Sequence, residues 1–140
     1  MRDAQLGAVG MDFGVVPGDV AASEVALEEW CRLGETFKAE PTRFREGDRQ
    51  SVSAYCVSLA VFSTSARALL AEGVTVAGRS APDRGRVVKS PHLVAWTQAS
   101  AQLQRWAKEN CLTPDSRLRA GLIDGPTEDD DSGVFGGRSA

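Results

Sequence analysis

Hydrophobic side chains recur at helical spacing in the first third of the chain, from about Asp19 onward. Successive apolar positions there lie 4, 4, 3 and 4 residues apart: Ala22, Ala26, Trp30, Leu33 and Phe37. This spacing places them on one face of an amphipathic helix. Pro41 disfavours helical backbone at the residue before it, so the pattern predicts a helix that ends at or before Glu40.

A second and longer apolar stripe begins after Gly47-Asp48 and ends at Gly73, a residue type suited to a helix C-terminus. Its members are Val52, Tyr55, Cys56, Leu59, Phe62, Ala66, Leu69 and Leu70. The stripe predicts one helix over residues 48–72, roughly 24 residues and roughly 36 Å long. A lone small domain seldom needs a helix of that length, so we expect it to pack against another chain.

Two β-branched runs, Val74-Thr75-Val76 and Val87-Val88, flank a loop rich in glycine and arginine and predict a two-stranded hairpin over residues 74–89. Such a hairpin is marginally stable alone and must lean on another element. Ser90-Pro91 then begins a helix that ends near Asn110, which tolerates a left-handed C-cap. One face of this helix carries Leu93, Trp96, Ser100, Leu103 and Ala107.

Thr113 followed by Pro114 predicts the start of a short last helix that runs to about Ala120. Together the elements predict a mainly α fold, in which a helical protomer has two long helices, a short β-hairpin between them and flexible termini. We expect a flexible N-terminal arm over residues 1–19, a helical core over residues 20–120 and a disordered acidic tail over residues 121–140.

Charge divides the 140-residue chain more sharply than its net value of −3 indicates. Residues 1–42 carry a net charge of −5, residues 43–119 carry +6 and residues 120–140 carry −4. A basic middle between acidic ends favours a core that binds a polyanion. Helical domains that bind no nucleic acid also carry uneven charge, so the split alone leaves both interpretations open.

The basic side chains of the middle segment gather in three places. They are Arg79, Arg84, Arg86 and Lys89 in the hairpin, Arg43, Arg45 and Arg49 in the connector before the long helix, and Arg117 and Arg119 in the last helix. We expect DNA binding through the hairpin group, with Arg117 and Arg119 as further candidates. For that last pair, a subunit interface with carboxylates of residues 1–42 is an equally open interpretation.

Candidate catalytic chemistry is missing from the sequence patterns. No Gly-rich phosphate loop, no carboxylate cluster with metal-ligand spacing and no activated serine or cysteine motif is present. Three widely spaced cysteines and the single His92 form neither a disulfide framework nor a zinc pattern, and we interpret the cysteines as buried or half-buried thiols of a reducing cytoplasm. The run of aspartates at 129–131 is typical of a solvated charge run. We therefore expect no enzyme activity, no cofactor and no metal.

Apolar faces of the two long helices provide more hydrophobic surface than one small protomer requires. We expect the oligomer interface among Tyr55, Leu59, Phe62, Trp96, Leu103 and Trp106. Base stacking is the weaker alternative for the tryptophans. No uninterrupted run of about 18 apolar residues is present, so we expect no membrane partner.

Several short motifs, taken in order, resemble the small terminase subunits of tailed double-stranded-DNA bacteriophages over roughly residues 27 to 120. A Trp-x-x-Leu pattern at Trp30 precedes GDRQSVSAYC, which is similar to the family's Asp-Arg-x-x-Leu-x-x-Tyr-Cys block. LLAEGVTV, KSPHLVAW and LTPDSRLR follow, and the last is similar to the family's Gly-Leu-Thr-Pro-x-Ser-Arg-x-Arg ending. Two positions depart from the family pattern: Cys111 replaces the usual glycine, and Val52 replaces the usual leucine.

The resemblance implies a non-enzymatic subunit that assembles into a homo-oligomeric ring in the host cytoplasm and is not expected in the mature virion. It implies binding to viral double-stranded DNA at the packaging-initiation site, and recruitment and regulation of the large terminase subunit, which holds the ATPase and nuclease. The 20–120 core would then carry both DNA binding and oligomerisation. Two other roles stay open on the residues alone: a small cytoplasmic DNA-binding regulator unrelated to packaging, and a structural helical adaptor that binds no nucleic acid.

Overall fold

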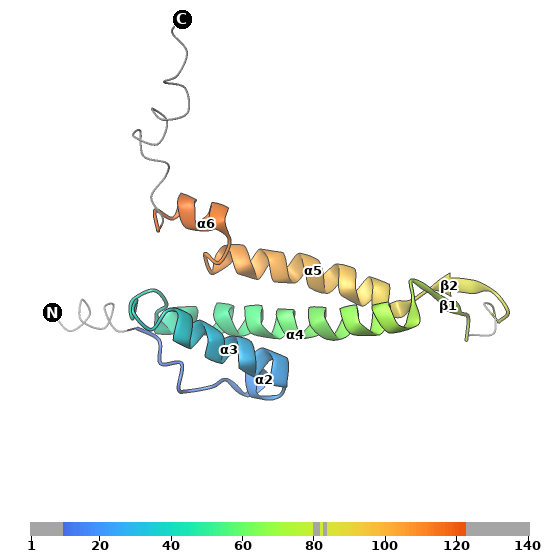
Figure 1. Ribbon diagram of the computed structural model, residues 1–140, viewed down its shortest axis with the longest axis horizontal. Helices are drawn as coiled ribbons and strands as arrows, with labels where there is room; N and C mark the ends of the chain where they lie inside the picture. The colour runs from blue at the N-terminus through green and yellow to red at the C-terminus, as the bar shows by residue number, and fades with distance from the viewer. Residues whose placement is uncertain (1–9, 80–81, 83, 123–140) are drawn as a thin grey trace, which may run out of the picture. The chain divides into compact units, whose positions relative to one another are not determined.

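The computed structural model describes residues 10–79, 82 and 84–122, and it confirms the mainly α fold (Figure 1). Its elements are α2 (Gly18–Ala21), α3 (Glu24–Thr36), the 3-10 turn η1 (Glu46–Asp48), α4 (Arg49–Glu72), β1 (Thr75–Ala77), β2 (Val87–Lys89), α5 (Pro91–Glu109) and α6 (Pro114–Arg119). Two compact units divide the chain after Asn110. The first contains every element through α5, and the second contains α6.

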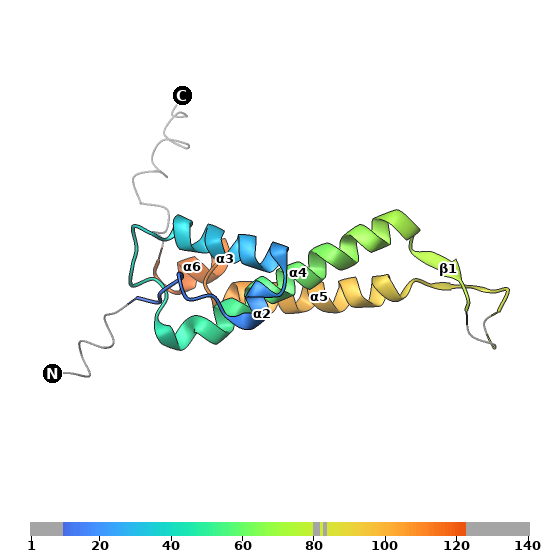
Figure 2. The same cartoon turned by 90° about the horizontal axis from the view of Figure 1, so that it is seen from below.

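The long helices α4 and α5 lie side by side and antiparallel, and they make the most extensive contact of the first unit (Figures 1 and 2). The β1–β2 hairpin joins them at one end. At the other end, α3 packs along the first half of α4, and α2 contacts both α3 and α4. The predicted boundaries of the two long helices and the hairpin agree with the structure to within a residue or two.

The single helix predicted from about Asp19 is interrupted. α2 ends at Ala21, and Ser23 adopts extended backbone (φ −132°) as the N-cap of α3, where its hydroxyl accepts a hydrogen bond from the Ala26 amide at 3.4 Å. A serine side chain that bonds a backbone amide in this way starts a new helix. It does not alter the spacing of the apolar residues, so the periodic pattern continues across the break.

The hydrophobic core lies around α3. Trp30 and Leu33 are fully buried there, together with Val20 from α2 and with Val52 and Cys56 from the first half of α4. Large buried side chains of this kind supply most of the favourable free energy of folding, so this end of the molecule has a core of its own.

Residues 10–17 pack on this core, which differs from the flexible arm expected over residues 1–19. The indole N–H of Trp30 donates to the Phe13 carbonyl at 2.7 Å, and Met11 is buried with its amide bonded to the Phe44 carbonyl. A Cβ at Gly34 would lie only 3.1 Å from the Phe13 side chain, so glycine at that position permits the close approach. The rest of the expected arm, residues 1–9, lies outside the described residues.

A buried carboxylate joins α3 to α4. Glu29 is 8% exposed and accepts hydrogen bonds from the Tyr55 hydroxyl at 2.9 Å and from the Arg32 guanidinium at 2.7 and 2.5 Å. Burial, followed by the hydrogen bond to Glu29, raises the pKa of Tyr55 to about 12. The pairing with Glu29 likewise raises the pKa of Arg32. The charge of Glu29 is therefore fully satisfied, as a buried carboxylate requires.

α5 ends next to Asn110 as predicted, but the left-handed conformation that this residue type tolerates occurs one position later. Asn110 stays right-handed (φ −88°), and Cys111 takes the left-handed conformation with φ 55°. Asn110 is buried, and its side-chain amide bonds the Ser51 carbonyl at 2.9 Å and the Trp106 carbonyl at 2.8 Å. Because these bonds hold Asn110 in the right-handed conformation, the chain turns at Cys111, which adopts the left-handed conformation.

The three cysteines do not share one environment. Cys56 is buried in the core, where burial raises the pKa of its thiol to about 12, and Cys111 is half-buried. Cys31 is exposed, so the prediction that all three are at least half-buried is wrong for this residue. Cys31 follows Trp30 on α3, and the side chain after an inward-facing residue points about 100° away from it on a helix.

By length and composition alone, one helical stretch of the described residues, Glu46–Glu72, passes the test for a membrane span. The sequence has no uninterrupted apolar run there, because serine and threonine alternate with its aliphatic residues. Only 17% of the residues in its most apolar part are fully buried within the protomer, and many of the others are half-buried.

Candidate nucleic-acid interface

The hairpin that carries the main candidate cations is a short antiparallel pair. Thr75 lies opposite Lys89, Val76 opposite Val88 and Ala77 opposite Val87. Beyond the strands, the Gly78 amide donates to the Arg86 carbonyl at 2.9 Å, which extends the pairing toward the tip. Side chains alternate between the two faces of a strand. Val76 and Val88 accordingly lie half-buried on one face, and Lys89 is exposed on the other.

The hairpin brings Arg79, Arg84, Arg86 and Lys89 together, and all four are exposed. The described part of the hairpin contains no acidic residue, and none of the four cations pairs with a carboxylate of the described residues. Exposed cations without paired carboxylates suit contact with phosphates, because neutralising a phosphate releases its condensed counterions. The hairpin also projects from the end of α4–α5 opposite α3, where it is accessible to a long polyanion (Figure 1).

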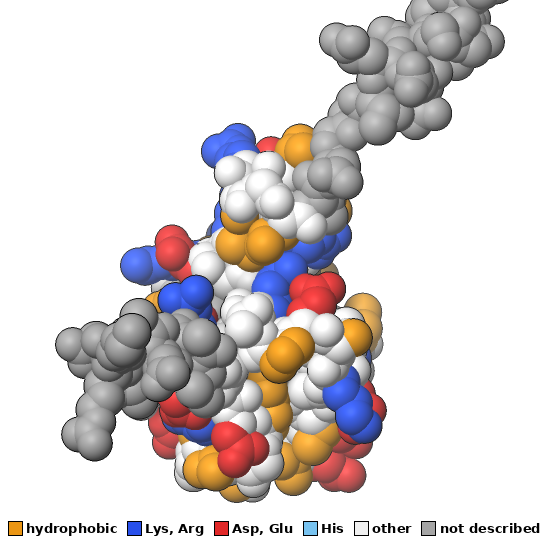
Figure 3. Space-filling view, turned by 90° about the vertical axis from the view of Figure 1, so that its left-hand side faces the viewer, with side chains coloured by type: hydrophobic (Ala, Val, Ile, Leu, Met, Phe, Trp, Pro, Cys, Tyr) orange, Lys and Arg blue, Asp and Glu red, His pale blue; other side chains and the backbone are white. Residues whose placement is uncertain are grey.

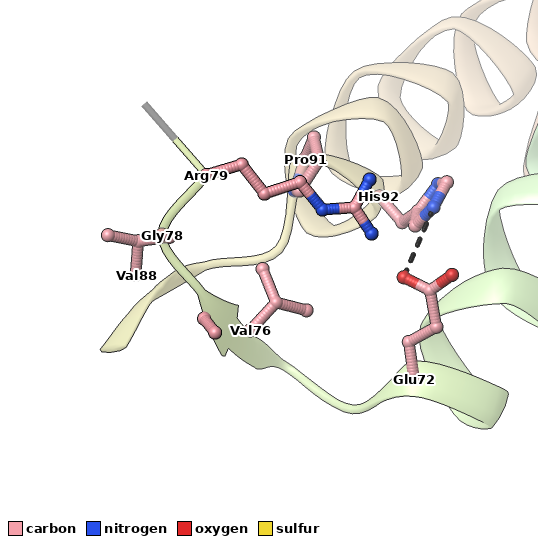
Figure 4. A pocket seen from close by; sticks show the side chains of 8 residues that line it. Glu72, Val76, Gly78, Arg79, Val88, Pro91 and His92 are labelled. Carbon is pink, nitrogen blue, oxygen red and sulfur yellow. Dashed lines mark ion pairs between the residues drawn. The ribbon is translucent and has the colours of Figure 1, made fainter. Parts of the chain in front are cut away.

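A cavity of about 280 Å³ lies where the hairpin meets the two long helices (Figure 4). Its lining combines apolar hairpin residues with charged ones from three elements: Glu72, Val76, Ala77, Gly78, Arg79, Val88, Pro91 and His92. Nε2 of His92 lies 3.5 Å from a carboxylate oxygen of Glu72, so the pair links the end of α4 to the start of α5. The Arg79 side chain reaches across the cavity toward His92. Glu72 and His92 are twenty positions apart, and sequence spacing gave no indication of their contact.

The arginines of α6 are more constrained than those of the hairpin. The Arg117 guanidinium donates to the Leu112 carbonyl at 2.8 Å, and Arg119 pairs with Asp115 at 3.1 Å, one turn earlier. Thr113 caps α6 as predicted, since its hydroxyl accepts from the Ser116 amide at 3.2 Å and the Ser116 hydroxyl accepts from the Thr113 amide. Arg119 nevertheless keeps a largely exposed side chain and can reach a second partner.

Two of the connector arginines serve the fold. The Arg49 guanidinium donates to Glu46 and to the carbonyls of Val15 and Asp12, at 2.6 to 3.1 Å, and lies 5.8 Å from the centre of the Trp30 ring. The ion pair lowers the pKa of Glu46 and raises that of Arg49. Arg49 therefore binds the N-terminal segment to the core.

Arg43 has a side chain only 7% exposed, and it lies over the rings of Phe37 and Phe44 with Glu40 at 3.7 Å. Of the three connector arginines, Arg45 alone is exposed. On the end of the molecule drawn in Figure 3, basic and acidic side chains are interspersed with hydrophobic ones. Among its described residues, the hairpin differs from that surface because its charged side chains are all basic.

The predicted oligomer-interface residues are all partly exposed, and several already have contacts within the protomer: Tyr55, Leu59, Phe62, Trp96, Leu103 and Trp106. The rings of Phe62 and Trp96 face each other across α4 and α5, with centroids 5.9 Å apart. The Tyr55 hydroxyl is bonded to Glu29 of α3. What these residues offer to a second chain is therefore the remaining exposed part of each side chain.

The family model described as "Phage terminase, small subunit" matches residues 26–126, which is more than half of the chain. The match extends from α3 through the hairpin to α6 and includes all six candidate cations. No curated protein and no solved structure matches the chain.

Proposed function

Because the chain belongs to the family of phage terminase small subunits, which serve in phage DNA packaging, we propose that it binds viral double-stranded DNA at the packaging-initiation site. We propose further that it recruits and regulates the large terminase subunit, acts as a homo-oligomeric ring in the host cytoplasm and has no catalytic activity of its own. The DNA contact is the part of this proposal that the described residues address directly.

One observation carries the DNA contact: the projecting hairpin presents four exposed cations and no carboxylate among its described residues. Each cation that neutralises a phosphate contributes about one unit to the slope of log K against log salt concentration. Arg79, Arg84, Arg86 and Lys89 would form the main contact. The short strands place them at the end of two long helices, so several copies in a ring would present a continuous basic surface.

Arg117 and Arg119 hold a second position in the proposal. Arg117 is engaged by the Leu112 carbonyl, so Arg119 is the better candidate for a phosphate. The acidic tail would dock on a basic face of the large subunit, because an acidic segment favours a basic partner over DNA. This tail begins at residue 121, and residues 123–140 lie outside the described residues.

The DNA contact is tested by measuring the affinity for a random-sequence DNA duplex across a range of salt concentrations. In the double variant Arg84→Ala/Arg86→Ala we expect weaker binding at every salt concentration and a slope reduced by about 2. The matched control is Lys38→Ala/Lys108→Ala, which also removes two positive charges from exposed positions but outside the hairpin. We expect its slope to change by less than half as much.

Equal affinity and slope in the hairpin variant and the wild type would contradict a hairpin contact. Equal losses in the hairpin variant and the control would indicate a response to net charge alone. A wild-type protein that binds no duplex at low salt would favour the structural adaptor instead.

A further inference from the structure

The helix α4 lacks the charged face expected of a helix exposed to water. Between its terminal residues Arg49 and Glu72, the only charged side chain is Arg67. A helix that is uncharged nearly all round is normally buried on all sides. Here α3 and α5 pack on α4, yet many of its side chains are only half-buried, and Val61 and Leu70 are 47% and 86% exposed. This remaining uncharged surface is available to a partner outside the protomer.

One side of α4 carries a regular stripe of small uncharged residues. Ala54, Val57, Val61, Thr64 and Ala68 follow one another at intervals of 3, 4, 3 and 4 residues, the spacing of a helix–helix seam. Each of them is half-buried or exposed, and Val61 is 47% exposed.

The middle of this stripe borders a groove between α4 and α5. The groove encloses about 280 Å³ and is lined by small aliphatic and uncharged polar side chains: Val57, Ser58, Val61, Ala95, Gln98, Ala99 and Gln102. A cavity of this size, without a charged residue, accommodates aliphatic side chains of a packed helix.

A matching ridge lies on the other side of the same helix. Leu59, Ser63, Ala66 and Leu70 are spaced 4, 3 and 4 residues apart, and Leu70 is 86% exposed. Ser63, Ala66 and Leu70 each come nine residues after a member of the stripe. Nine residues are two and a half helical turns, so the ridge and the stripe point in opposite directions. The ridge of a protomer consequently cannot fill its own groove.

We propose that the Leu70 ridge of one copy of this chain docks in the α4–α5 groove of the next copy. A groove and a ridge on opposite sides of one helix define a head-to-tail interface, which repeats from copy to copy and closes into a ring where the rotation permits. This inference rests on the proposed ring assembly and specifies its two surfaces. It moves the interface from the rings of Phe62 and Trp96, which already contact each other, to the free sides of α4.

The distribution of the core favours a second copy over an occasional partner. From Val61 to Gln98, the only buried residues that the structure describes are Ser65 and Ser90. The parts of α4 and α5 within residues 61–98 have no buried aliphatic residue among those the structure describes, so they need constant support from outside the protomer. A second copy is present whenever the chain is made, so it meets that need at all times.

The test uses the full chain with Val61→Glu, which puts a charge in the groove, and Leu70→Glu, which puts one on the ridge. Multi-angle light scattering after gel filtration gives the mass of each assembly as a multiple of the 14.9 kDa chain. We expect each variant alone to be monomeric. Mixing the two should give a species of two chains and nothing larger, because one intact ridge then meets one intact groove and propagation stops there.

Gln104→Glu is the matched control, since it adds the same charge at an exposed position of α5 outside the groove lining, and it should assemble like the wild type. Circular dichroism verifies the helix content of each variant. If a glutamate variant loses helix, Val61→Gln or Leu70→Gln replaces it under the same criteria.

The head-to-tail docking is overturned if either variant assembles like the wild type or if the mixture stays monomeric. A wild-type protein that is monomeric or dimeric, or one that is monomeric and sediments with lipid vesicles, overturns it as well. These outcomes leave the salt dependence of DNA binding untouched, so failure of the docking is distinguishable from failure of the proposed function.

Discussion

The two ends of the first unit differ in how they are held together. In the packed end, which we define as residues 10–60 and 99–110, α3 and the N-terminal segment cover a core centred on Trp30. In the open end, residues 61–98, the helices and the hairpin enclose no buried aliphatic residue among those the structure describes. The packed end has the interior of a small independent domain, and the open end has the surface of an incomplete one.

The two ends differ in whether apolar surface is buried within one chain or stays exposed to a partner. A free energy of folding comes from apolar surface removed from water, and the packed end removes it within one chain. The open end keeps Leu70 and Val87 at 86% and 76% exposure and also bears the cations of the hairpin. The proposed assembly would stabilise the end that carries the proposed DNA contact, and oligomerisation and DNA binding would then be coupled through the same segment.

The largest effect is expected from Trp30→Ala, which would break the packed end. Removing a fully buried tryptophan costs about 3–5 kcal/mol, a large part of the stability of a small domain. It also removes the hydrogen bond to the Phe13 carbonyl. Urea unfolding followed by circular dichroism should show this loss at every protein concentration.

Trp96→Ala is the companion variant at the open end. Its ring is half-buried against Phe62, so we expect a loss of about 1–2 kcal/mol. Because the proposed association would stabilise that end, the loss should depend on protein concentration. If Trp30→Ala and Trp96→Ala lost the same amount of stability, independently of protein concentration, the packed end and the open end would not differ in how they are stabilised.

A smaller effect is expected from Tyr55→Phe, which sharpens the comparison by removing one bond between α3 and α4. A typical hydrogen bond contributes about 1 kcal/mol net, and Glu29 keeps its bonds to Arg32, so the variant should be less stable by about 1 kcal/mol at pH 7. The folded-state pKa of Tyr55 is raised to about 12 from an ordinary value near 10.

The tyrosine's contribution is therefore full below pH 10 and is lost as the pH rises toward 12. The difference in stability between wild type and Tyr55→Phe should shrink over that interval, as measured by urea unfolding at a series of pH values. Other groups titrate there too, but they are common to both proteins and cancel in the difference. A constant difference would show that the pKa of Tyr55 is not raised in the folded protein.

The smallest effect is expected from His92→Gln at the open end. His92 and Glu72 both have side chains that are more than a third exposed, and exposed ion pairs contribute about 0.5 kcal/mol or less. The midpoint of urea unfolding should hardly change at pH 6 or pH 8. A loss comparable to that of Tyr55→Phe would mean that the open end depends on its own polar contacts more than on assembly.

The sequence predicted the long helices and the hairpin well because their apolar stripes are long and regular. It did not predict the break at Ser23, since a capping serine leaves the spacing of apolar residues unchanged. The left-handed Cys111 was also missed, because it follows from the tertiary bonds of Asn110 to Ser51 and Trp106. In both cases side-chain hydrogen bonds decided the backbone conformation.

The sequence predicted that the hairpin cations lie on one local element, but it did not indicate which of the other arginines stabilise the fold. The hairpin cations are close in sequence, so a local element was sufficient to bring them together. Arg43 and Arg49 look like the hairpin arginines in the sequence. In the structure, however, Arg43 lies over an aromatic ring, and Arg49 donates to backbone carbonyls that are distant in sequence. The free faces of α4 left a trace in the sequence, which is the lack of charged residues between Arg49 and Arg67.

Because the Trp30 indole is bonded to the Phe13 carbonyl, the fluorescence of Trp30 can report whether the N-terminal segment is docked. An indole fully shielded from water emits at shorter wavelength than the half-exposed indoles of Trp96 and Trp106. In a protein with Trp96→Phe and Trp106→Phe, fluorescence would follow the docking of the N-terminal segment alone. In the reverse variant, Trp30→Phe, it would follow the long helices. Release of the N-terminal segment and dissociation of the proposed assembly could then be followed separately, because each would change the emission of a different tryptophan variant.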